Sequence, residues 1–159
     1  MEESDVLTTV KEILETLLGL MGIEAAVEPH TTSFASEEGE APLALDIKGE
    51  DLGILIGRRG QTLASLQYIL QVLVSQKTGT YAPLIVDVEG YKARRYENLR
   101  ALARRIADQV RASRCPFALE PMPPYERRLI HLALASDPDV TTESTGIDEA
   151  RKVVIKPKN

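Results

Sequence analysis

The sequence predicts an α+β fold arranged as two small domains. Its 159 residues suit either one domain or two of about 70 to 90 residues each. Apolar residues alternate in several short stretches, as in strands, and recur at helical spacing in several longer ones. The elements before Gly90 can enclose a core by themselves, and a different region begins there. We therefore expect one domain over residues 1–89 and a second over residues 90–159.

The first domain is expected to hold one layer of three strands covered by helices. An amphipathic helix over residues 4–18 comes first, and two alternating stretches around residues 23–27 and 43–47 follow as a hairpin. The segment at residues 29–41 is rich in Thr, Ser, Glu and Gly, which is typical of a connecting loop.

A short helix, a glycine loop and a longer helix are expected next. Asp51 is placed to cap a helix that runs through Ile56. Apolar residues at helical spacing from Leu63 onward mark the longer helix, which ends near Gly79. Pro83 opens the third strand, so the order is helix, strand, strand, helix, loop, helix, strand.

The second domain is expected to be a smaller α+β unit that begins with a long helix. Apolar residues recur on one face over residues 91–113, and Pro116 ends this helix. The elements expected after it are a short strand near Phe117, a helix over residues 125–135 that Pro124 opens, and two strands over residues 140–144 and 151–156.

Composition excludes several classes of function. No apolar run approaches the roughly 18 residues of a membrane span, and the acidic N-terminus is unlike a signal peptide. The single cysteine, Cys115, rules out an internal disulfide and favours a reduced, cytoplasmic protein. The two histidines, His30 and His131, lie far apart in sequence and lack the cysteine partners of a metal site. We find no set of catalytic residues, so we expect no enzyme, no metal and no cofactor.

Charge is distributed unevenly along the chain. The net charge is −5, which by itself argues against nucleic acid. Residues 1–50 hold 12 acids and 2 bases, whereas residues 51–159 hold 12 acids and 17 bases. The overall balance therefore hides a basic portion, and a local basic patch is what nucleic-acid binding requires.

The stretch Gly57-Arg58-Arg59-Gly60 is the strongest candidate for a phosphate-binding loop. Two glycines allow a tight turn and a close approach by another molecule. The second glycine also opens a helix, whose N-terminus favours anions. The alternative is an ordinary corner between two helices with two solvated arginines.

Two further groups of basic residues are candidates for nucleic-acid contacts. Arg100, Arg104 and Arg111 are expected close together on the side of the long helix away from its apolar face. Arg127 and His131 are four residues apart on the next helix and so share a face. The alternatives are a solvated helix face for the first group, and a structural histidine beside a surface arginine for the second.

These motifs together resemble a known pair of domains. The segment Leu55–Leu63 resembles the GxxG core of a KH domain, and the order of elements around it resembles the prokaryotic, type II arrangement. The segment Pro124–His131 resembles the Arg-x-x-x-His signature of the R-3-H domain, which binds single-stranded nucleic acid. A KH domain followed by an R-3-H domain is similar to the Jag family, the SpoIIIJ-associated RNA-binding proteins of bacteria.

The resemblance implies a fold and a set of contacts. The first domain is implied to be type II KH, and the second an R-3-H domain with a long N-terminal helix. The residues implied to hold or line the RNA are Gly57, Arg58, Arg59, Gly60, Ile56, Leu63 and the strand residue Ile47 in the first domain, with Arg127 and His131 in the second. Arg100 and Arg104 as further phosphate contacts rest on the helix face alone.

The implied function is non-catalytic binding of single-stranded RNA, as a post-transcriptional regulator or RNA chaperone. Single-stranded DNA is an alternative ligand, since contacts to the 2′-hydroxyl cannot be read from sequence. A second hypothesis is a protein-interaction module that pairs with another KH protein or with itself. Many members of the family carry an additional N-terminal domain, which this chain, as a short version or a trimmed piece, is expected to lack.

Overall fold

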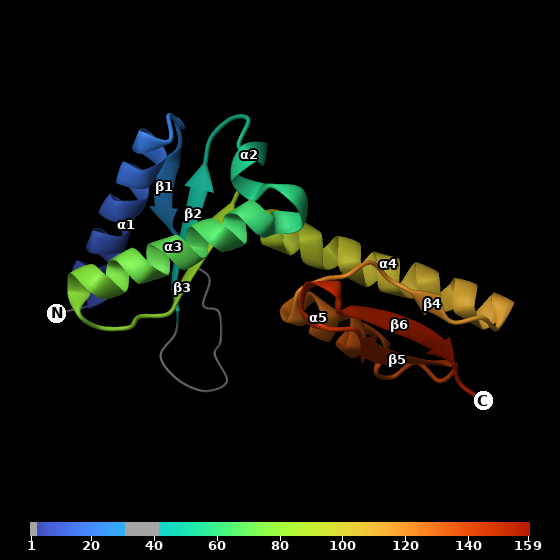
Figure 1. Cartoon of the computed structure of the whole chain (residues 1–159). Coiled ribbons are helices and arrows are strands. Elements are labelled where there is room, and N and C mark those ends of the chain that lie inside the picture. The colour runs from blue at the N-terminus through green and yellow to red at the C-terminus, as the bar shows by residue number, and fades with distance from the viewer. Residues whose placement is uncertain (1–2, 31–41) are drawn as a thin grey trace. The chain divides into compact units, whose positions relative to one another are not determined.

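A computed structural model describes residues 3–30 and 42–159 of the chain (Figure 1). The chain forms two units, Met1–Lys92 and Ala93–Asn159, so the division falls three residues after the expected boundary. Each unit combines a three-stranded sheet with helices, which confirms the predicted α+β class. The expected connecting loop lies largely outside the described residues.

In its described residues, the first unit contains three strands and three α-helices (Figure 1). They are α1 (Glu3–Leu20), β1 (Ala26–Pro29), β2 (Leu43–Lys48), α2 (Gly53–Ile56), α3 (Gln61–Thr78) and β3 (Leu84–Val88), with a single 3-10 turn at Arg58–Gly60. The strand order is β1-β2-β3, with β1 antiparallel and β3 parallel to β2. The antiparallel pair is the predicted hairpin, in which Val27 lies opposite Ile47.

The parallel pairing of β2 and β3 explains where the glycine loop lies. Parallel strands need a crossover connection, and here α2, the 3-10 turn and α3 provide it. The loop therefore joins two helices at one end of α3, as Figure 1 shows. The core that supports it is aliphatic, because α1 and α3 pack on each other and on strands whose inward residues alternate.

The second unit contains the long helix, a short helix and a second sheet (Figure 1). They are α4 (Tyr91–Ser113, which begins in the first unit), β4 (Phe117–Ala118), α5 (Pro124–Leu134), β5 (Val140–Thr145) and β6 (Lys152–Pro157), with a 3-10 turn at Asp148–Ala150. The strand order is β4-β6-β5, and both pairs are antiparallel. In the described residues, none of the helices is long and apolar enough to cross a membrane.

One local expectation needs correction. Asp51 does not cap α2: the N-cap residue is Leu52, and no side chain supplies the capping hydrogen bond. Asp51 instead has a positive φ of 52°, so it makes the turn that precedes α2. On α4, Leu99, Ile106 and Val110 are buried on one face and Leu102 is half-buried against the same core, as the apolar spacing predicts. Ala103 and Ala107 are buried beside them.

Candidate nucleic-acid interface

The glycine loop has a conformation that only glycine adopts easily at two of its four positions. Gly57 has φ 69° and ψ −170°, and Gly60 has φ 77° and ψ 14°. A Cβ on Gly57 would overlap the Thr62 hydroxyl and lie 2.7 Å from the Thr62 Cβ. A Cβ on Gly60 would lie 2.9 Å from the Tyr91 ring. Both the backbone angles and the packing therefore require glycine at the first and the last position of the loop.

The two arginines between the glycines differ in exposure. Arg58 is exposed and has no hydrogen-bond or ion-pair partner among the described residues. Arg59 is half-buried and has a positive φ of 54°, an unusual value for a residue with a side chain. Arg58 is thus the guanidinium that the loop offers to solvent.

The N-terminus of α3 adds a second favourable feature for an anion. Gly60 is the N-cap residue, and no side chain caps the helix. The first turn contains no acidic residue, so the partial positive charge of the 18-residue helix is not neutralised locally. Arg58 and this helix end together create a positive surface of the kind that binds phosphate.

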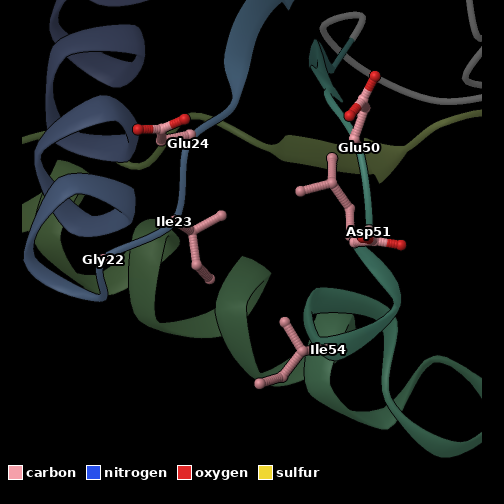
Figure 2. A pocket seen from close by; sticks show the side chains of 7 residues that line it. Gly22, Ile23, Glu24, Glu50, Asp51 and Ile54 are labelled. Carbon is pink, nitrogen blue, oxygen red and sulfur yellow. The ribbon is translucent and has the colours of Figure 1, made fainter.

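A hollow lies beside α2, the short helix that directly precedes the glycine loop in the sequence. Its volume is about 530 Å³, and Figure 2 shows Ile23 and Ile54 facing the same space with acidic side chains around them. The hollow is lined by Gly22, Ile23, Glu24, Glu50, Asp51, Leu52 and Ile54. Ile54 is 73% exposed although it is a large apolar residue. The exposure of Ile54 does not follow from helical spacing, which does not show which face of so short a helix points outward.

Two of the residues implied to line the RNA do not reach the surface. Leu63 is 2% exposed and Ile47 is 0% exposed, and both belong to the core of the first unit. Both side chains pack inside this core and offer no surface to a base. Ile56 is half-buried and packs against the same core. On α2, the large apolar side chain that remains exposed is therefore Ile54.

In the second unit, Arg127 and His131 lie on α5 one turn apart, as expected from their spacing. The Arg127 Nε donates a hydrogen bond of 3.1 Å to the Met122 carbonyl oxygen. Both ring nitrogens of His131 are within hydrogen-bond distance of hydroxyls on β5: Nδ1 is 2.6 Å from Thr142 Oγ1, and Nε2 is 2.7 Å from Ser144 Oγ. Partial burial and then the nearby Arg127 charge lower the pKa of His131 below its ordinary value.

The arginines of α4 do not form one uniform phosphate surface. Arg100 is paired with Glu97 at 2.6 Å. Arg111 forms ion pairs with three aspartates, Asp108, Asp137 and Asp139. These carboxylates neutralise the Arg111 guanidinium and, by hydrogen bonding, raise its pKa. The expected grouping of Arg111 with its neighbours as a phosphate contact is therefore not supported.

Arg104 is exposed and has no side-chain partner among the described residues. It lines a small hollow of about 240 Å³ between α4 and the end of α5, together with Asp108 and Asp137. Two carboxylates in the same hollow weaken the attraction of Arg104 for a phosphate. Arg104 and Arg100 are consequently weaker candidates than Arg58 and Arg127.

A buried ion pair that the sequence did not reveal fixes α5 to α4. Glu126 is 0% exposed, and its two carboxylate oxygens accept hydrogen bonds of 2.9 and 3.0 Å from Arg95 Nε and Nη2. Glu126 directly precedes Arg127 on the helix. A glutamate next to two arginines reads as a surface residue, and only the fold shows that its side chain points inward.

Comparisons with known proteins agree with both predicted domain types. A family model described as the KhpA/KhpB KH domain matches residues 11–86, and the R-3-H domain model matches residues 97–157. The RNA-binding protein KhpB of Clostridium symbiosum is 41% identical over 147 residues, which cover 92% of this chain and 64% of that protein.

Two more distant relatives bear the same name. The RNA-binding protein KhpB of Bacillus subtilis (strain 168) is 38% identical over 124 residues, covering 77% of this chain and 60% of the relative. The RNA-binding protein KhpB of Streptococcus pneumoniae serotype 2 is 25% identical over 150 residues, which cover 94% of this chain and 44% of the relative. The chain thus spans less than two thirds of the length of these curated relatives. With both domain types in the predicted order and relatives that match across them, the chain belongs to the KhpB/Jag family of KH and R-3-H domain proteins.

Proposed function

We propose that this chain binds single-stranded RNA and catalyses no reaction. In this proposal the glycine loop holds the sugar-phosphate backbone, and the α5 surface around Arg127 makes a second contact. The observation that carries the proposal is the loop itself. Its two glycines are required by geometry, and Arg58 is exposed beside an uncapped helix N-terminus. The name of the relatives, RNA-binding protein, supports RNA as the ligand.

The hollow beside α2 gives the bases a place to lie. A strand whose phosphates rest on the loop can turn its bases toward Ile54 and Ile23, where flat aromatic rings gain apolar contact. The carboxylates of Glu24 and Glu50 at the rim disfavour phosphate and accept hydrogen bonds from amino groups of bases. The backbone and the bases are thereby directed to different surfaces.

Charge reversal at the two ends of α3 tests the role of the loop. Arg58→Glu and Lys77→Glu change the net charge equally, and both residues are exposed near opposite ends of the same helix. Affinity for a short, fluorescently labelled single-stranded RNA of mixed sequence is measured by anisotropy at two salt concentrations. Arg58→Glu should weaken binding by about tenfold or more and reduce the salt dependence, whereas Lys77→Glu should have a small effect. Equal losses would show a general charge effect and contradict a specific role for the loop.

A protein-interaction module is the second candidate function. Tyr68, Ile69 and Val72 are exposed on α3, although large apolar residues usually lie inside. Such a face is suited to pairing with another KH protein or with a second copy of this chain. Sedimentation velocity with and without RNA separates the two functions. Self-association that Tyr68→Glu abolishes, together with no RNA binding, would favour the interaction module.

The same anisotropy assay distinguishes RNA from single-stranded DNA. An RNA and a DNA of the same sequence differ mainly in the 2′-hydroxyl, so an equal affinity would favour a general single-strand binder.

We further infer that the chain acts in the cytoplasm, since its only cysteine, Cys115, is an exposed free thiol of the kind kept reduced there.

A further inference from the structure

Both ring nitrogens of His131 lie within hydrogen-bond distance of hydroxyl groups on β5. Its Nδ1 lies 2.6 Å from Thr142 Oγ1 and its Nε2 lies 2.7 Å from Ser144 Oγ. Thr142 and Ser144 are two apart on the strand and therefore share the face that also carries the buried Val140. No ring nitrogen is left for a ligand unless one of these hydrogen bonds breaks.

The protonation state of the ring determines what the two hydroxyls can do. Partial burial and the charge of Arg127 favour the neutral ring, which has one N–H donor and one acceptor nitrogen. One hydroxyl must donate its hydrogen to the acceptor nitrogen. The other hydroxyl accepts from the ring N–H and keeps its own hydrogen. Neither hydroxyl has a further hydrogen-bond partner in the described part of the chain, so one O–H donor remains for an external acceptor.

Arg127 lies one turn before His131 and is fixed at one end. Its Nε donates to the Met122 carbonyl oxygen, which leaves the two terminal nitrogens of the guanidinium to contact a ligand. Arg127, Thr142 and Ser144 are half-buried, so none of these residues is closed off from solvent. A fixed guanidinium and a nearby O–H donor are complementary to a phosphate, which only accepts hydrogen bonds.

We propose that His131 is a positioning residue, and that the ligand contacts of this unit come from the Arg127 guanidinium together with the β5 hydroxyls of Thr142 and Ser144. The ligand chemistry is the phosphate of a nucleic-acid backbone. The inference rests on the proposed function of single-stranded RNA binding. It assigns two contact residues that the Arg-x-x-x-His motif does not contain, and it gives the histidine of that motif a different role.

Removal of the hydroxyls tests the contact residues. Thr142→Val keeps the shape of the side chain and Ser144→Ala keeps the strand, so both are introduced into the full chain, singly and together. Thr141→Val is the matched control, because Thr141 is exposed on the other face of β5. The double variant should lower the affinity for a long single-stranded RNA of mixed sequence, able to reach both binding surfaces, by about threefold to tenfold, and Thr141→Val should leave it unchanged. An unchanged affinity for the double variant would overturn the assignment of the hydroxyls.

The ring nitrogens of His131 test the positioning role in the unaltered protein. Their ¹⁵N resonances are recorded at pH 7 in the full chain, free and saturated with the same RNA. A positioning residue stays neutral and keeps its tautomer. A ring that becomes doubly protonated on the RNA would show a direct phosphate contact and overturn the proposal. His131→Gln, which still offers a donor and an acceptor, should retain most of the affinity, whereas His131→Leu should not.

The outcomes separate this inference from the proposed function. Arg127→Ala is measured in the same assay. If it leaves the affinity unchanged, the second unit does not bind RNA, and the proposed function fails for that unit. If Arg127→Ala weakens binding but the hydroxyl variants do not, only the further inference fails.

Discussion

At the scale of single residues, the conformation of Gly57 sets the shape of the loop. We predict that Gly57→Ala destabilises the first unit more than Gly79→Ala does. Both glycines have positive φ, but Gly79 has nothing within 4 Å of an added Cβ, whereas Gly57 faces Thr62. Gly79→Ala should cost about 1–2 kcal/mol for the left-handed backbone, and Gly57→Ala about 1–3 kcal/mol more for the overlap. Urea unfolding of the two variants measures the difference, and equal costs would show that Thr62 simply moves aside.

His131 gives the second unit a predictable response to acid. Because its pKa in the folded chain is lowered below the ordinary 6.5, the unfolded chain binds the proton more readily. The stabilising contribution is therefore present above pH 6.5 and is lost as the pH falls through the lower pKa of the folded state. Unfolding free energies measured across this range should decline in the wild-type chain and decline less in His131→Gln. A parallel pH dependence in both proteins would refute a role for this ring.

At the scale of elements, the buried pair between Arg95 and Glu126 holds α5 on α4. Glu126→Gln replaces the buried carboxylate that accepts two hydrogen bonds from Arg95 with a neutral amide, which should cost about 3–5 kcal/mol. Glu97→Gln is the matched control, since it removes the exposed partner of Arg100 and should cost less than about 1 kcal/mol. Thermal and urea unfolding compare the two. Similar small losses would mean that the buried pair is not what fixes α5.

Element boundaries show what the sequence can and cannot predict. The span of α4 follows from its apolar spacing and from Pro116, and α5 begins at Pro124 because proline fits the first turn of a helix. The parallel pairing of β2 with β3 was not predicted, because strand periodicity does not specify a neighbour. Helical spacing likewise did not reveal that Ile54 is exposed, since this depends on how the four-residue α2 packs.

Side-chain partners were also beyond the reach of the sequence pattern. Arg111 reads as a free cation on a basic helix, but Asp137 and Asp139 reach it from a turn about 26 residues away. His131 reads as a ligand contact, but its partners lie on a strand that follows α5. Motif spacing identifies which residues gather near a site, and only the fold identifies which of them remain available.

At the scale of the whole molecule, two binding surfaces on one chain should act together on a long strand. We predict that Arg127→Ala weakens binding of a long single-stranded RNA but hardly affects an RNA just long enough to occupy the glycine loop. Linkage raises the effective concentration at the second surface only when both surfaces reach one strand. Affinities are compared across a series of RNA lengths. A loss that does not depend on length would indicate that the surfaces bind independently.

Backbone amide mapping tests the central claim most directly. The full 159-residue chain is labelled with ¹⁵N and titrated with a short single-stranded RNA of mixed sequence. We predict that the amides of Gly57, Arg58, Arg59, Gly60 and Thr62 shift on binding, whereas those around Lys77 at the other end of α3 do not. An RNA that binds with unchanged amide resonances at residues 57–62 would contradict the account.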